Sequence, residues 1–380
     1  MMRRTRKNLL TEWWWTIDRP MLLVLILILF SGLILSMAAS PPVAERLGLD
    51  SFHFVKRHAF FIPIALTLMI GMTFLDPRTI RRVALALLIA SLVGMVMTLF
   101  IGFSAKGSQR WITILGFSLQ PSEFLKPSFV VLAAWLFAEN DRRPEIPGNL
   151  FSIVLFMVSV VLLVAQPDIG QTVLLASVWG GLFFMAGMPL FWIFLLAGLG
   201  VGGLTMAYFF VPHVTGRINR FLDPETGDTF QVDTAMDSIV RGGWLGTGPG
   251  EGMVKRILPD SHTDFIFAVL AEEFGIIVCL LLVSAYLFVV LRSLSMALKT
   301  QDLFKRLAIS GLALLFGLQA VINIAVNLQL LPAKGMTLPF ISYGGSSLLS
   351  VAIAMGFLLA LTRRRPEVGL EQSQFYQSQK

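Results

Sequence analysis

MLLVLILILFSGLILSMAA, residues 21–39, contains no charged side chain. The hydrocarbon core of a bilayer is crossed by an α-helix of about 20 mainly apolar residues, so this run is long enough to span it. It is too long for the apolar part of a cleavable signal peptide, and no cleavage site of small residues follows it. We therefore expect the first membrane-spanning helix here.

Similar apolar runs recur along the chain. They cover residues 58–75, 83–103, 124–138, 150–166, 169–187, 190–211, 265–291, 307–331 and 342–361. Because 56% of all residues are hydrophobic and only 14% are charged, one soluble core could not bury them. The sequence predicts an all-α polytopic membrane protein with about ten transmembrane helices. Residues 21–211 would form helices 1–7 and residues 265–361 helices 8–10.

The basic residues support this count. If residues 1–20 are a cytoplasmic tail, Lys and Arg clusters fall on the cytoplasmic side after every second span, as the positive-inside rule requires. These clusters are Arg3 to Lys7, Arg78 to Arg82, Arg142 and Arg143, Arg292 to Arg306, and Arg363 to Arg365. Both termini are then cytoplasmic, with residues 362–380 as the second tail. Topology thus accounts for the net charge of +7, and we expect no nucleic-acid partner.

The same alternation makes residues 212–264 one large extracytoplasmic loop. Loops of this length are usually functional or disordered. Four residues of types that favour burial predict an ordered cap over the membrane domain. They are Phe221, Phe230, Trp244 and Leu245. The glycine-rich part GGWLGTGPGEG, residues 242–252, is either a turn-rich connection or a phosphate contact, and it lacks the lysine of a P-loop.

Ionisable groups at the edges of spans are functional candidates, because burying them in lipid is costly. The first group lies in KGSQRWITILGFSLQPSEFLK, residues 106–126. It comprises Lys106, Arg110, Trp111, Glu123 and Lys126. Cations beside an interfacial aromatic residue suit an anionic lipid headgroup. The alternative is an ordinary interfacial belt in which a lysine extends to the membrane surface.

The second group is QPDIGQ, residues 166–171, where Pro167 and Gly170 interrupt the helical pattern around Asp168 and Gln171. Interrupted backbone at the membrane edge must face protein or water rather than lipid. Either these side chains belong to a functional site, or the segment is a tight outer turn between two spans.

The third group lies in SHTDFIFAVLAEEFG, residues 261–275. Asp264 precedes an apolar run, where its carboxylate is either a functional group or a cap for the helix that follows. Glu272 and Glu273 lie further inside this run, so at least one of them should face a polar interior.

Two further segments complete the candidate site. Gln319, Asn323 and Asn327 share one helix face at i, i+4 and i+8, where amides either join two helices or line a wet cavity. The segment LPAKGMTLPFISYGGSS, residues 331–347, has the prolines and glycines of irregular backbone. Its Lys334 and Ser342 would suit a wall of the same outer cavity.

Together these segments resemble the SEDS family (shape, elongation, division and sporulation), the multispanning glycosyltransferases that polymerise lipid II into peptidoglycan. The sequence AKGMTLPFISYGGSS, residues 333–347, resembles the cell-division branch of the family more than the elongation branch. The resemblance implies lipid II as substrate and a septal location in the bacterial inner membrane. It also implies a class B penicillin-binding protein transpeptidase and other division proteins as partners. Asp264 corresponds to the proposed catalytic carboxylate of the family, and residues 106–126 to its lipid-binding outer loop.

Glycan polymerisation requires a base and positive charge. Asp264 would take the proton of the acceptor hydroxyl, which typically contributes about 100- to 10,000-fold in rate. Cations would neutralise the departing pyrophosphate. The outer-side candidates are Arg110, Lys126, Arg217, Arg220 and Lys334. A divalent cation, Mg²⁺ or Mn²⁺, held by a carboxylate could assist. Two alternatives stay open: a transporter that carries lipid II across the membrane without chemistry, and a non-catalytic scaffold.

Overall fold

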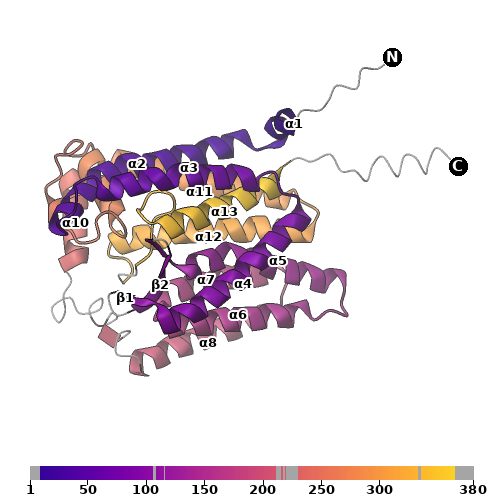
Figure 1. The fold of residues 1–380 in the computed structure, drawn as a ribbon. Helices are drawn as coiled ribbons and strands as arrows, with labels where there is room; N and C mark the ends of the chain where they lie inside the picture. Colours follow the sequence, from indigo (N-terminus) through magenta and orange to yellow (C-terminus); the bar gives the residue numbers. More distant parts are fainter. Residues whose placement is uncertain are drawn as a thin grey trace, which may run out of the picture.

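The computed structural model describes residues 9–105, 108–114, 116–210, 215–216, 219, 230–332 and 335–363. Helices dominate it (Figure 1). They are α1 (Leu9–Thr16), α2 (Arg19–Arg46), α3 (His53–Met72), α4 (Pro77–Ile101), α5 (Pro121–Arg142), α6 (Gly148–Ala165), α7 (Ile169–Met185), α8 (Leu190–Phe210), α10 (Phe230–Gly242), α11 (Ile266–Leu298), α12 (Leu303–Asn327) and α13 (Gly345–Thr362). A 3₁₀ turn, η2 (Val254–Arg256), and the strands β1 (Phe103–Ala105), β2 (Ser108–Ile114) and β3 (Phe117–Leu119) complete the described elements.

Each predicted span overlaps one helix of the structure, so the predicted all-α polytopic fold is confirmed. Among the described residues, seven helices are long and apolar enough to cross a membrane, namely α2, α3, α4, α6, α11, α12 and α13. The apolar helix α7 is shorter, and α5 carries several charged residues. The count of ten spans therefore stays a prediction.

Three helices begin at an aspartate cap at the same end of the bundle. The Asp18 carboxylate accepts the backbone N–H of Met21 in α2, and Asp302 accepts that of Lys305 in α12. Asp76 caps α4 in the same way. A carboxylate at this position satisfies an otherwise unpaired amide and complements the positive end of the helix dipole. These caps lie in or beside the basic segments that the charge pattern assigns to the cytoplasm.

The centre of the bundle is formed by α12 and α13, which lie between α2, α3 and α11 on one side and α4 to α7 on the other (Figure 1). The most apolar windows of these two central helices are 67% and 83% buried, against 22–44% for the other candidate spans. Close approach is possible because small residues sit at the crossings. A Cβ at Gly356 of α13 would lie 2.7 Å from the carbonyl oxygen of Met69 in α3.

Helix α11 is interrupted at Gly275, whose φ of 77° and ψ of 175° are not helical. The loop that precedes α11 occupies this break. A Cβ at Gly246 would lie 2.2 Å from the carbonyl oxygen of Glu273, and one at Gly242 would lie 1.9 Å from that of Ala271. The glycine-rich stretch is thus a connection whose backbone packs directly against the backbone of α11. The break divides the helix that the sequence predicts as one continuous span, residues 265–291.

The loop packs on the bundle, but not through the residues that predicted a cap. Trp244 is 70% exposed and Leu245 is 80% exposed, and Phe230 is also exposed, while Phe221 lies outside the described residues. Contact is made instead by α10 against α11 and by the glycines. Hydrophobic residue type therefore identified the wrong contacts in this loop.

Outside the loop that precedes α11, two of the described features are not predicted by the sequence. Helix α1 precedes the first span, and a three-stranded antiparallel sheet connects α4 to α5. In this sheet Phe103 pairs with Trp111, and Ile112 pairs with Leu119. The sheet places Arg110 and Trp111 beside the start of α5, where the next candidate residues begin.

Candidate functional site

The candidate residues fall into two groups. Lys106, Arg217, Arg220 and Lys334 lie outside the described residues. The remaining candidates come from β2, α5, the turn before α7, the first turn of α7, and the segments that precede α11 and α13. They are Arg110, Trp111, Glu123, Lys126, Asp168, Gln171, Asp264 and Ser342.

The guanidinium of Arg110 is buried against the QPD turn. Its Nε donates to the carbonyl oxygen of Gln166 at 3.1 Å, and Nη2 donates to that of Pro167. Its Nη1 lies 3.4 Å from Oδ2 of Asp168. Burial raises the pKa of the Asp168 carboxyl, and the neighbouring Arg110 charge opposes that rise. Asp168 also caps α7, as the turn interpretation of this segment requires, and a functional role of its carboxylate stays a prediction.

A buried ion pair lies at the start of α5. The Lys126 ammonium is 2.8 Å from Oε2 of Glu123 and donates to Oε1 of Gln319 at 3.1 Å. The other oxygen of Glu123 accepts a hydrogen bond of 2.8 Å from the Gln171 amide. Lys126 is only 2% exposed and therefore does not extend to the membrane surface, while Lys106, the other lysine of this segment, lies outside the described residues.

The amide stripe of α12 binds backbone in neighbouring segments. Gln319 donates to the carbonyl of Thr337 at 3.1 Å, and Asn323 donates to that of Met336 at 2.6 Å. Asn327 accepts a bond of 3.1 Å from the backbone N–H of Ala268 in α11. Of the two roles left open by the sequence, the described contacts favour joining of elements over lining of a cavity.

Three consecutive carbonyl groups before α11 are fixed from outside. Tyr343 donates its backbone N–H to the carbonyl of His262 at 2.9 Å, and the Ser342 hydroxyl donates to that of Thr263 at 2.5 Å. The carbonyl of Asp264 accepts from both Asn323 and Asn327, at 2.9 and 3.0 Å. Each backbone carbonyl group of the HTD segment, residues 262–264, therefore accepts a hydrogen bond from a distant part of the chain.

The Asp264 side chain, by contrast, is only partly buried. Its Oδ2 faces the LPAKG segment, because a Cβ built at Gly335 would lie 3.5 Å away. The cap position of α11 is Phe265, which makes no side-chain cap bond, so the structure does not support the alternative in which Asp264 caps this helix. A carboxylate on rigid backbone, next to glycine, can accept a proton from a molecule bound beside it.

The described contacts also change the expected role of two cations. Arg110 and Lys126 are both buried and each contacts a carboxylate, Asp168 and Glu123 respectively. Their charge is therefore already balanced, and they hold β2, α5 and α7 together. Negative charge on a ligand would have to be met mainly by other groups.

One cluster was found only in part from the sequence. Glu272 accepts the backbone N–H groups of Val254 and Lys255 at 2.7 and 2.9 Å. The Lys255 ammonium pairs with Glu273 and donates to the carbonyl of Ala38 at 3.1 Å. The glutamates were recognisable as charges in an apolar run, but Lys255 lies in the loop and no local pattern predicts its burial. This cluster ties the loop before α11 to α2 and to the break in α11.

Within the described part of the chain, no group of three His, Cys, Asp or Glu side chains is arranged to hold a metal ion.

Comparison with known proteins gives a consistent result. The family model described as "Cell cycle protein", for FtsW, RodA and SpoVE, matches residues 18–367. A protein of Caulobacter vibrioides (strain NA1000 / CB15N), named probable peptidoglycan glycosyltransferase FtsW, is 47% identical over 96% of this chain and 93% of its own. A protein of the same name from Trichlorobacter lovleyi (strain ATCC BAA-1151 / DSM 17278 / SZ) is 36% identical over 91% and 93%.

Solved structures agree in fold. A chain from work on the structural coordination of polymerization and crosslinking by a peptidoglycan synthase complex has a TM-score of 0.73 at 26% identity, covering 91% of this chain and 97% of that chain. The rod shape determining protein RodA of Thermus thermophilus has a TM-score of 0.68 at 25% identity, with 93% and 99% covered.

Proposed function

Because this chain belongs to the cell cycle protein family of FtsW, RodA and SpoVE, we propose that it polymerises lipid II with Asp264 as the general base. The chain is a peptidoglycan glycosyltransferase, the activity for which its curated relatives are named. Lipid II as the substrate, Asp264 as the base and the division septum as the cellular location are what we propose in addition.

The proposed step is a displacement at the donor sugar. The 4-hydroxyl of an acceptor N-acetylglucosamine attacks the anomeric carbon of the donor, the bond from that carbon to the lipid pyrophosphate breaks, and undecaprenyl pyrophosphate leaves. Asp264 takes the hydroxyl proton. The observation that carries this assignment is the contrast between its fixed backbone and its partly exposed carboxylate. The fixed backbone supports this assignment, because general base catalysis needs a carboxylate on a rigid support.

The pyrophosphate requires positive charge that is not already balanced. Since Arg110 and Lys126 contact carboxylates, they fit a positioning role in the wall of the site. Lys106, Arg217, Arg220 and Lys334 are the remaining outer-side cations of the sequence, and in this proposal they meet the leaving group.

The proposal extends to a partner and a place. A class B penicillin-binding protein would crosslink the strands that this chain makes, at the division septum of the inner membrane. The similarity to a chain of a peptidoglycan synthase complex supports such an assembly.

The test uses the full chain, purified with its transpeptidase partner and supplied with lipid II. Glycan strands are separated on a gel for the native protein, for Asp264→Asn and for Glu251→Gln, which removes an exposed carboxylate from the same loop. We expect Asp264→Asn to lose at least 100-fold in rate while Glu251→Gln stays near native. If Asp264→Asn keeps more than a tenth of the native rate, Asp264 is not the base. If the native complex makes no strands but moves lipid II between leaflets, the chain is a transporter.

A further inference from the structure

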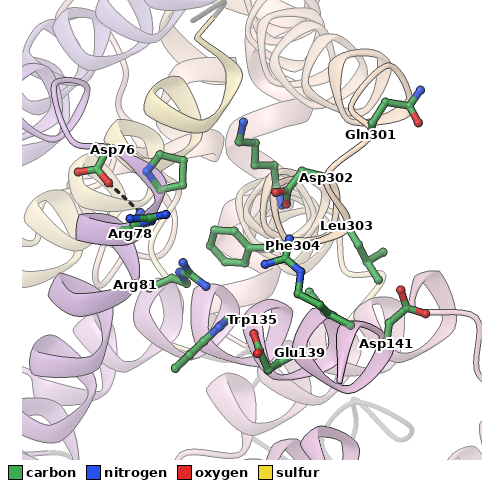
Figure 2. A pocket seen from close by; sticks show the side chains of 14 residues that line it. Asp76, Arg78, Arg81, Trp135, Glu139, Asp141, Gln301, Asp302, Leu303 and Phe304 are labelled. Atoms are coloured by element: carbon green, nitrogen blue, oxygen red, sulfur yellow. Dashed lines mark hydrogen bonds between the residues drawn. The ribbon is translucent and has the colours of Figure 1, made fainter. Parts of the chain in front are cut away.

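A cavity lies at the opposite end of the bundle from Asp264 and is independent of the proposed function. It has a volume of about 550 Å³ and is bounded by the first turn of α4, the last turns of α5 and the start of α12 (Figure 2). All three helix ends belong to the side that the charge pattern assigns to the cytoplasm.

Most of the acidic groups around this cavity are already engaged. Asp76 and Asp302 cap the helices α4 and α12, where their carboxylates accept backbone N–H groups. Glu139 pairs with Arg143, with Nε and Oε1 3.3 Å apart. Asp141 is the remaining acidic residue of the lining.

The basic groups are not matched in the same way. Four basic side chains line the cavity, and within the described residues none of them has a carboxylate within 4.0 Å. They are Arg78, Arg81, Arg142 and Lys305. The lining holds as many carboxylates as cations, but within the described residues none of these carboxylates forms an ion pair with one of the four cations, so the donors of the four basic side chains are available to a ligand.

Two aromatic rings hold one of these cations in place. The Arg81 guanidinium carbon is 5.3 Å from the ring centroid of Trp135 and 5.2 Å from that of Phe304 (Figure 2). Arginine held against aromatic faces keeps its donors available in a fixed plane, which suits a phosphate group. The buried indole N–H of Trp135 has no hydrogen-bond partner among the described residues, so the lining holds a further unused donor.

The surroundings indicate that the phosphate belongs to a lipid. Leu85 and Ile89 lie one and two turns beyond Arg81 on the same face of α4, and both are exposed, at 44% and 54%. This apolar strip would accompany acyl chains that run from a headgroup in the cavity. We propose that this cavity binds the phosphate of an anionic phospholipid from the cytoplasmic leaflet. Basic pockets between the cytoplasmic ends of transmembrane helices are suited to such headgroups.

The test measures lipid binding to the purified full-length protein by native mass spectrometry, with thermal stability as a second readout, since a ligand that binds only the folded state stabilises it. The probes are phosphatidylglycerol, phosphatidylethanolamine and soluble glycerol 3-phosphate. Each is titrated against the native protein, against Arg81→Gln with Lys305→Gln, and against Arg82→Gln with Arg306→Gln. The last pair removes the same charge from exposed neighbours that do not line the cavity.

We expect the native protein to prefer phosphatidylglycerol, and the cavity pair to weaken its binding by about 25-fold, roughly fivefold per charge. The control pair should stay within about twofold of native. Equal losses in both pairs, equal binding of phosphatidylethanolamine, or equally tight binding of glycerol 3-phosphate would each overturn the proposal. If the cavity pair does not fold, Trp135→Phe decides, because it keeps the ring and removes only the N–H. An unchanged affinity in that variant counts against the site.

Discussion

Asn323 donates a hydrogen bond of 2.9 Å from its side-chain Nδ2 to the backbone carbonyl of Asp264, from a helix that lies 59 residues further along the chain. The same amide also donates to the carbonyl of Met336, in the segment that faces the Asp264 carboxylate. One side chain of α12 thus fixes both the proposed base and the backbone across from it. Asn323 therefore sets the spacing between the backbone at Asp264 and the backbone at Met336.

Asn323→Ala should therefore lower the polymerisation rate without preventing insertion. The change leaves one buried carbonyl with no side-chain donor and another with only Asn327, which costs about 1–3 kcal/mol in folding stability. The misplaced base should reduce kcat by at least tenfold, with a smaller effect on KM, in a lipid II polymerisation assay. Val321→Ala, on the exposed face of the same helix, is the matched control and should keep near-native kcat. Equal kcat for both variants would show that Asn323 does not position Asp264.

The Glu123 and Lys126 pair should behave as a unit. Lys126→Met or Glu123→Gln alone leaves a buried group without its partner, which for buried pairs costs about 3–5 kcal/mol in stability. The double variant removes both charges and should recover part of this loss. Thermal denaturation of the native protein, the two single variants and the double variant in one detergent gives the coupling energy between Glu123 and Lys126. If the double variant is as unstable as the sum of the single ones, the two charges do not stabilise each other.

Two glycines of the loop before α11 allow the stability cost of backbone strain to be distinguished from the cost of lost packing. Gly246 and Gly250 have similar φ values of 81° and 85°, so alanine should cost each about 1–2 kcal/mol from the left-handed conformation. Only Gly246 also meets backbone, because its Cβ would lie 2.2 Å from the carbonyl oxygen of Glu273, whereas the space at Gly250 is open. Gly246→Ala should therefore lower the melting temperature clearly more than Gly250→Ala. Equal melting temperatures would show that the loop does not rely on this contact.

What the sequence predicts well is local in the chain. The apolar runs locate the helices because each run is continuous, and the amide stripe is recognisable because i, i+4 and i+8 fall on one helix face. The α5 run was set at residues 124–138, whereas the helix extends from Pro121 to Arg142. Hydropathy treats Glu123 as a charge that ends the span, but in the fold it lies inside the helix and pairs with Lys126.

What the sequence does not predict depends on distant partners. Lys126 and Gln319 are separated by 193 residues, so no spacing rule connects them. The break in α11 at Gly275 has the same cause, because glycine alone does not interrupt an apolar helix. The break exists where the backbone of Trp244 and Gly246 packs against that position. Likewise, the pairing of Arg110 and Lys126 with carboxylates could not be read from their presence near an aromatic residue.

Arg110→Lys tests whether the guanidinium acts through its charge or through its shape. Arg110 contacts the carbonyl groups of Gln166 and Pro167 and the carboxylate of Asp168 with three different nitrogens. A lysine keeps the charge but presents a single nitrogen on a flexible stem, so it cannot make all three contacts in one plane. We expect Arg110→Lys to lose most of the polymerisation activity and some thermal stability, with Arg143→Lys, an exposed arginine at the far end of α5, as the control. Near-native activity of Arg110→Lys would mean that positive charge alone suffices at this position, and the turn before α7 would then not depend on the planar contact.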